Sequence, residues 1–432
     1  MRVWGFFSVL LAFSIVINLW RLPHLVLENG GGAFLLLLFI MLHLVGLPLI
    51  LAEVSLARVL RGSSLRRLYA LKRAEGVSRF QFQSARVFIF LQTLLLFLLL
   101  TFLIHISTES LVYAYHYLAM ASDWFHPSPH EAFQPHFYHR LLAILVSLVF
   151  IYGMARLQSP FWQRQFTEKL LPFVFALLLL IFLKRLFYVT NMEAIKGLFY
   201  PDFNSLRASA FLEALGHSLL LLVITLGIYR FSVFNRKIVD PVQLSVQVVL
   251  QVMACSLLTG TMAIPMLSEV NESPFGMSWI FEVLPRWLSY GDFGNYYCLL
   301  FFSSFFVMLI YLSVILLRTF QKLSKDFHRL QVASSLVSPL VLAFIVDLGF
   351  YLEMNKDNWQ GWWGQGWLNS LEIVYIQFAM PAMALVFIWF LFSFTNEKER
   401  QLVFTRQQIF YHSRVFFKSW QVILKFVIPP LI

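Results

Sequence analysis

Charged residues are scarce in this sequence. Lys, Arg, Asp and Glu make up 13% of its 432 residues, whereas 59% are hydrophobic and 17% are aromatic. Soluble globular domains carry about 25% charged and about 45–50% apolar residues, so the composition excludes that class. The mean hydropathy of +0.73 points the same way. We therefore predict an all-α polytopic membrane protein, with the lipid bilayer as its surroundings.

Cysteine is almost absent. Cys255 and Cys298 are the two cysteines, and both lie within or at the edge of apolar runs. Two isolated thiols exclude a disulfide framework and a cysteine metal site. We expect both to be buried free thiols.

Motifs for enzymatic chemistry are missing as well. Neither the apolar runs nor the segments between them contain a metal-ligand spacing, a nucleophile elbow or a phosphate loop. Four histidines gather in one segment, but they match no metal motif and prolines interrupt them: His126, His130, His136 and His139. The sequence therefore predicts no catalytic residues, no metal site and no enzyme.

Long hydrophobic runs are what the sequence has in abundance. A hydrocarbon core of about 30 Å needs about 20 apolar residues per helix. By this length criterion, ten runs are candidate membrane-spanning helices. They are 3–22, 33–57, 87–118, 141–157, 168–189, 208–229, 243–267, 297–317, 331–352 and 367–394. No small-residue cleavage site follows the first run, so we expect a retained helix rather than a signal peptide. The last segment, 422–432, is too short to cross, and its Pro429-Pro430 pair should end a helix.

The positions of Lys and Arg predict the orientation of the chain. With the N-terminus in the cytoplasm, 25 of the 33 basic residues fall on inner segments and 8 on outer ones. Basic residues concentrate on the cytoplasmic side of membrane proteins. We therefore predict a multi-pass protein of the cell's inner (plasma) membrane with a cytoplasmic N-terminus. The net charge of +11 then belongs to inner loops near anionic lipids, and no nucleic-acid partner is expected.

Residues 18–53 carry the most specific pattern: NLWRLPHLVLENGGGAFLLLLFIMLHLVGLPLILAE. An arginine deep in a bilayer is costly, so Arg21 should lie where the first helix reaches the outer face, with Pro23 ending or kinking that helix. Three glycines, 30–32, should form the turn that restarts the chain as the second helix.

This stretch resembles, without a gap, the signature of the neurotransmitter:sodium symporter family. Weaker matches follow in the family's order: Glu109-Ser110, YPDF at 200–203, Ile264-Pro265, Leu284-Pro285 and FFSSFF at 301–306. The resemblance implies a divergent bacterial-type member with the LeuT-type fold, in which two five-helix inverted repeats hold the substrate between broken helices 1 and 6. Residues 1–394 would then be a single transmembrane domain, with 1–190 and 191–394 as its repeats. Residues 395–432 would be a basic cytoplasmic tail with a truncated eleventh helix, which leaves the oligomeric state undetermined.

The resemblance also implies roles for individual residues. The residues matched to substrate and ion binding are Asn18, Ser14, His105 and Gln251. The outer gate is matched by Arg21, Glu372 and His217, with Asp357 as the alternate acid. Glu53 is expected to bond to helix ends as a structural residue.

The sequence departs from the family where sodium would bind. The stretch LAFSIVI, residues 11–17, has no glycine, which favours a continuous first helix. In LLLVITLG, residues 220–227, Leu221 and Val223 stand where the family has hydroxyl side chains, so we expect the break in helix 6 to be filled in as well. Sodium coupling is then weakened, and His105 with Glu109, one turn apart, becomes a candidate proton relay.

Two functional interpretations stay open. The first is a secondary active transporter for an amino acid or related small amine, symporter-like and with degenerate sodium sites. The alternative is a non-transporting relative that acts as a sensor or partner subunit, in which Phe13, Leu221 and Leu309 close the cavity. We take the first as the prediction. Sodium is the one cofactor that the resemblance implies.

Overall fold

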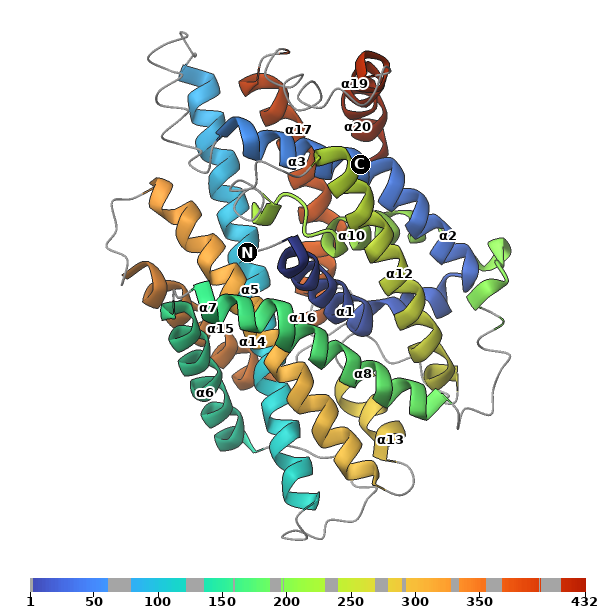
Figure 1. The fold of residues 1–432 in the computed structure, drawn as a ribbon, viewed down its shortest axis with the longest axis vertical. Helices are drawn as coiled ribbons and strands as arrows, with labels where there is room; N and C mark the ends of the chain where they lie inside the picture. Colours follow the sequence, from blue (N-terminus) through green and yellow to red (C-terminus); the bar gives the residue numbers. More distant parts are fainter. Residues whose placement is uncertain are drawn as a thin grey trace.

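The structure is a computed structural model of the chain, shown in Figure 1. It describes residues 3–60, 79–121, 136–157, 160–186, 196, 198–229, 240–268, 279–289, 293–327, 334–354, 367–395, 397 and 413–432. Within these residues every regular element is a helix, and the β-type pairing consists of an isolated bridge between Gly31 and Pro201. The all-α prediction is confirmed.

Helices occupy all ten predicted runs. In the first half of the chain they are α1 (Val3–Glu28), α2 (Gly32–Met41), η1 (Leu42–Gly46), α3 (Leu47–Leu60), α5 (Arg79–Ala121), α6 (Phe137–Arg156), α7 (Pro160–Gln165), η2 (Phe166–Leu170) and α8 (Leu171–Leu186). In the second half they are η3 (Phe203–Ser205), α10 (Ala210–Leu221), α12 (Pro241–Ser268), η4 (Trp279–Val283), α13 (Leu284–Ser289), α14 (Gly294–Phe327), α15 (Ser334–Met354), α16 (Trp367–Ile373), η6 (Val374–Ala379), α17 (Met380–Phe394), α19 (Ser413–Val422), η7 (Ile423–Val427) and α20 (Ile428–Leu431).

Eight helical stretches of the described chain are long and apolar enough to cross a membrane. They are Gly5–Glu28, Gly32–Val54, Gln83–Ala121, Phe137–Arg156, Phe161–Lys184, Pro241–Met262, Gly294–Leu323 and Ser370–Ser393. The two remaining predicted runs contain the shorter apolar helices Ala210–Leu221 and Ser338–Gly349.

Helix α1 lies in the middle of the molecule (Figure 1). It packs most extensively against α12 and also contacts α10, α8 and α14. The other large interface joins the two longest helices, α5 and α14. Side chains along α1, including Phe6, Phe13 and Val16, are at most 1% exposed. The centre of the fold is therefore built around α1.

Helix α1 is unbroken from Val3 to Glu28, which confirms the continuity expected from the glycine-free stretch 11–17. Pro23 lies inside the helix and does not end it. A proline removes one backbone hydrogen bond but leaves φ helical, and burial of α1 among its neighbours outweighs that loss. Arg21 accordingly lies within the helix, about 10 Å before its end at 1.5 Å per residue.

The glycine turn between α1 and α2 forms as predicted. Gly30 and Gly31 have φ of +77° and +61°, a region in which side chains are strained. The turn also packs tightly, since a Cβ on Gly30 would lie 2.1 Å from the carbonyl oxygen of Asp202. The amide of Asp202 in turn donates to the Gly30 carbonyl at 3.2 Å. Two motifs that lie far apart in the sequence, the glycines and YPDF, therefore meet at one place.

The expectation for helix 6 was wrong. Helix α10 ends at Leu221, and the chain then passes through left-handed residues: Val223 with φ of +50°, Thr225 with +70° and Gly227 with +81°. A run of such residues cannot continue a right-handed helix. The break is therefore retained although the family's hydroxyl side chains are absent.

The C-terminal segment also differs from the prediction. Helices α19, η7 and α20 follow one another without interruption from Ser413 to Leu431, so the final helix starts well before residue 422. Pro429 and Pro430 fall within α20, the last helical turn. The indole of Trp420 donates to the carbonyl of Pro48 at 3.0 Å, which ties this helix to the start of α3.

Candidate substrate and ion site

Glu53 of α3 holds the break that follows α10. Its two carboxylate oxygens accept hydrogen bonds from the backbone N–H groups of Thr225, at 2.9 Å, and Gly227, at 3.1 Å. The amide of Gln92 on α5 donates to the Thr225 carbonyl. Backbone groups freed inside a membrane protein need such partners, because no water is there to replace them. The expected structural role of Glu53 is confirmed by these contacts.

Asn18 of α1 stands at the centre of a buried polar cluster. Its amide nitrogen donates to the Ser256 hydroxyl of α12 at 3.1 Å, and its carbonyl oxygen lies 3.2 Å from Nε2 of His217 on α10. All three side chains are 0% exposed. Asn18, predicted for binding, and His217, predicted for the outer gate, are thus brought into one site. Ser256 was missed, because a lone serine in an apolar run carries no spacing signal.

Two other predicted binding residues are not part of this cluster. The amide of Gln251 donates to the carbonyl of Phe7 at 2.8 Å. Phe7 precedes Asn18 by eleven residues on α1, about 16 Å along the helix axis, so the structure does not bring Gln251 to Asn18. The hydroxyl of Ser14 donates to the Leu10 carbonyl of its own helix at 2.9 Å.

Arg21 forms an ion pair with Glu372 of α16. Its Nε lies 3.3 Å from a carboxylate oxygen, and both side chains are 2% exposed. Of the two acids matched to Arg21, Asp357 lies outside the described residues. The pair joins α1 to α16 above the Asn18 cluster, where the resemblance implies an outer gate.

A second set of polar contacts lies at the same end of α1. Glu28 accepts from Arg207 at 3.0 Å and lies 3.4 Å from His24 one turn earlier. The amide of Asn29 donates to Glu213 of α10 at 3.1 Å. These contacts join the end of α1 to α10 and the segment before it.

The structure does not support the predicted pairing of His105 with Glu109. Nδ1 of His105 is in close contact with the carboxylate of Asp347 on α15. Glu109 instead pairs with Arg140 of α6 at 3.0 Å. Asp347 was missed because its partner lies 242 positions away in the sequence, and nothing in the spacing of α5 or α15 indicates it.

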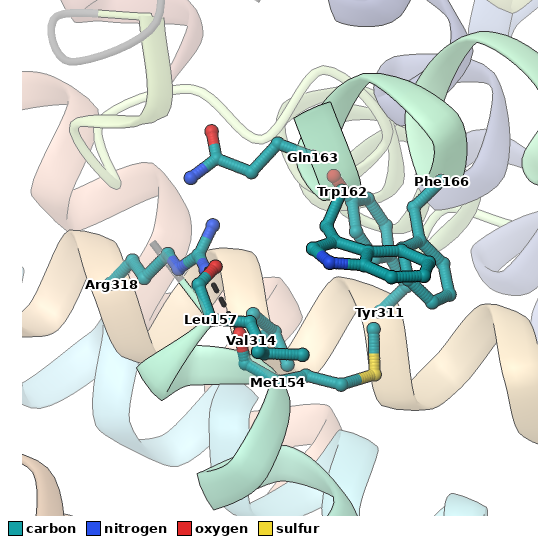
Figure 2. A pocket seen from close by; sticks show the side chains of 8 residues that line it. All are labelled: Met154, Leu157, Trp162, Gln163, Phe166, Tyr311, Val314 and Arg318. Atoms are coloured by element: carbon teal, nitrogen blue, oxygen red, sulfur yellow. Dashed lines mark hydrogen bonds between the residues drawn. The ribbon is translucent and has the colours of Figure 1, made fainter. Parts of the chain in front are cut away.

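A pocket lies at the junction of α6, α7, η2 and α14. Its lining residues are Met154, Leu157, Trp162, Gln163, Phe166, Tyr311, Val314 and Arg318 (Figure 2). The guanidinium of Arg318 donates to the carbonyls of Met154 and Leu157, both at 2.9 Å, and so caps the end of α6. None of the predicted site residues lines this pocket. It is separate from the Asn18 cluster.

The side chains expected to close the centre are buried. Phe13 is 1% exposed, and Leu221 and Leu309 are 0% exposed. A transporter in a closed conformation and a relative with a filled cavity would both bury these three residues. The retained break after α10 removes one of the two reasons for the non-transporting interpretation.

Sequence comparison finds a family profile that matches part of the chain and a relative similar along most of it. Residues 7–134 match the sequence profile of the sodium:neurotransmitter symporter family. The chain is also 23% identical over 439 aligned positions to an uncharacterized sodium-dependent transporter of Haemophilus influenzae, covering 96% of this chain and 91% of that protein. The chain therefore resembles this family over residues 7–134, and it resembles a sodium-dependent transporter along nearly its whole length.

Two further comparisons give a short match of higher identity and a match of the whole fold. It is 56% identical over 41 residues to the human sodium- and chloride-dependent neutral and basic amino acid transporter B(0+), a match to 10% of this chain and 6% of that protein. The crystal structure of MhsT in complex with L-phenylalanine superposes with a TM-score of 0.82 at 18% identity, covering 100% of this chain and 97% of that one. The fold is therefore of the LeuT type.

Proposed function

We propose that this chain belongs to the sodium:neurotransmitter symporter family and is a secondary active transporter, symporter-like, for an amino acid or a related small amine. It would act in the inner (plasma) membrane with its N-terminus in the cytoplasm. The observation that carries the proposal is the break after α10, next to the buried cluster of Asn18, His217 and Ser256. Non-helical backbone persists at membrane depth where it serves a binding site, and discontinuous helices mark substrate sites in transporters.

The substrate class is supported by the relatives. The human relative is named for neutral and basic amino acids, and the MhsT structure contains L-phenylalanine. In this chain α1 is continuous, so it offers no half-helix N-terminus to a substrate carboxylate. Recognition of the carboxylate would fall to hydrogen-bond donors in the cluster, the amide of Asn18 and the imidazole of His217.

Sodium binding is the family property that this chain supports least. A sodium ion exchanges its water shell for several oxygen ligands, and unwound helices supply most of them. The unbroken α1 keeps its carbonyls in helical hydrogen bonds, so of the family's two unwound helices only the one after α10 could supply backbone oxygens beside the side chains of Asn18 and Ser256. We therefore expect substrate binding that does not require sodium.

The test is equilibrium binding of a labelled mixture of the twenty L-amino acids to the purified protein, in sodium buffer and again in potassium buffer. Binding in both buffers supports the proposal, whereas binding in sodium alone overturns the expectation about ions. If no amino acid binds in either buffer, the proposed substrate class is overturned and the non-transporting interpretation is favoured.

A matched pair of variants on α12 localises the site. Ser256→Ala removes the hydroxyl that contacts Asn18, and we expect it to weaken binding. Ser245→Ala removes an equally buried hydroxyl whose bond is to the Pro241 carbonyl of its own helix, and binding should be unchanged. Equal effects of the two variants would place the binding site elsewhere.

A further inference from the structure

Four ionisable side chains from three helices meet away from the Asn18 cluster. His105 and Glu109 lie on α5, Arg140 on α6 and Asp347 on α15. They form two pairs, His105 with Asp347 and Glu109 with Arg140. Helix α15 packs against both α5 and α6, so the two pairs form one continuous charged group between three helices.

The first pair is the more deeply buried. The Asp347 side chain is 0% exposed and that of His105 is 4% exposed, whereas Glu109 is 9% and Arg140 16% exposed. His105 lies near the middle of the apolar stretch Gln83–Ala121. An ionisable group at such a depth is expensive, and in membrane proteins it usually marks an ion or proton pathway.

Asp347 is only partly satisfied. One carboxylate oxygen contacts His105, and the other is buried without a hydrogen-bond partner among the described residues. The outer face of α15 consists of exposed apolar side chains, among them Leu342, Ile345 and Val346. The helix therefore turns its carboxylate inward and its apolar face outward, so the acid is shielded from lipid.

The two pairs respond differently to protons. An arginine–carboxylate pair is neutral without an added proton. An imidazole ordinarily titrates near neutral pH, so a histidine–carboxylate pair such as His105 with Asp347 is neutral only when it holds one proton. A sealed, low-dielectric site favours the neutral state, and contact with water allows the proton to leave.

We infer that the His105–Asp347 pair is a proton-binding site that couples proton movement to transport. A proton from water adds to the neutral imidazole facing the carboxylate, and the same proton returns to water when the conformation changes. No other bond forms or breaks. This inference rests on the proposed transport function and names its coupling ion.

The surroundings of the pair define a route for the proton. The charged groups that act on His105 within the described structure are Asp347, Glu109 and Arg140. Exposure increases from Asp347 through His105 and Glu109 to Arg140, which lies in the first turn of α6. The Arg140 end of the group is therefore the side nearest to water, where the proton would enter and leave.

Proteoliposomes test the coupling directly. They are prepared in potassium buffer without sodium, with the interior more alkaline by one pH unit, and given the labelled mixture of L-amino acids. One proton per substrate sustains at most about tenfold accumulation per pH unit. We expect such accumulation in the wild type and its loss in both His105→Gln and Asp347→Asn. Glu168→Gln, which removes a half-buried acid paired with the exposed Arg164, should accumulate as the wild type does.

Accumulation that is the same with and without the pH gradient, or that persists in both variants, would overturn the inference. A second measurement separates this failure from failure of the transport proposal. The purified proteins are titrated between about pH 5 and about pH 9, a range that brackets the titration of histidine. Asp347→Asn should take up one proton fewer per molecule than Glu168→Gln. The double variant His105→Gln, Asp347→Asn, which leaves no titratable group at the pair, is the second variant should the first misfold. Equal uptake by all of them would exclude the proton site, whether or not amino acids bind.

Discussion

The substitution Glu53→Gln should destabilise the fold, because it acts on the backbone of the break after α10. Glu53 is 2% exposed and accepts from the N–H groups of Thr225 and Gly227. A glutamine keeps one acceptor oxygen and turns an NH₂ group toward the second N–H. One charge-assisted bond, worth about 1.5–3 kcal/mol, is then lost, and a buried donor left without a partner costs about 1–3 kcal/mol. Relief from burying a carboxylate offsets part of the sum, so we expect a loss of about 2–4 kcal/mol in unfolding free energy.

The assay is a denaturant titration of the purified protein in mixed micelles, comparing the free energy of unfolding of Glu53→Gln with that of the wild type. Glu282→Gln is the control, since Glu282 is an exposed acid and such changes usually stay within about 0.5 kcal/mol. If Glu53→Gln also stays within that range, the carboxylate does not hold the break, and our account of why α10 ends at Leu221 is refuted.

Three more predictions concern the region around the end of α1; the first and third use the same titration, and the second uses the yield of purified protein. Glu372→Gln leaves Arg21 buried without its counter-charge and should lower the free energy of unfolding by about 3–5 kcal/mol. Adding Arg21→Gln should recover most of that loss. A double variant no more stable than Glu372→Gln alone would contradict this. Gly30 has positive φ, and in Gly30→Ala the new Cβ would lie 2.1 Å from the Asp202 carbonyl oxygen, so this variant should give no monodisperse protein. Gly153→Ala, whose Cβ would have no atom within 4 Å, should be tolerated. Equal yields of the two purified variants would contradict this. Hydrogen bonds from the Ser205 hydroxyl and then from the backbone N–H of Asn204 lower the pKa of Asp202, so the ionised carboxylate stabilises its turn above the ordinary aspartate pKa, and that stabilisation is lost as the pH falls through the lowered pKa. Asp202→Asn should remove this dependence of the unfolding free energy on acid pH. The same pH dependence in the variant and the wild type would contradict this.

Local chemistry explains what the sequence analysis predicted correctly at the outer end of α1. The glycines at 30–32 indicate a turn because few other residues adopt positive φ. The expected partner of Arg21 rests on the resemblance to the family, and the structure places Glu372 against it. The continuity of α1 follows from the absence of glycine in residues 11–17.

The break after α10 shows where such reasoning fails. The residues of LLLVITLG have helix propensity enough to continue the run. Their conformation is imposed instead by the carboxylate of Glu53 and the amide of Gln92, which come from two other helices. Tertiary hydrogen bonds of this kind outweigh local propensity, and they cannot be seen in the segment itself.

The sequence by itself determined the apolar surroundings, the resemblance to the family and the glycine turn after α1, because these depend on composition and on contiguous residues. The tertiary structure alone decided which polar residues meet: Ser256 with Asn18, Gln251 with Phe7, and Asp347 with His105. The physical reason is that a helix apolar on all sides has no amphipathic pattern to indicate its rotation. The direction in which one polar side chain points is then set by packing against helices distant in the sequence.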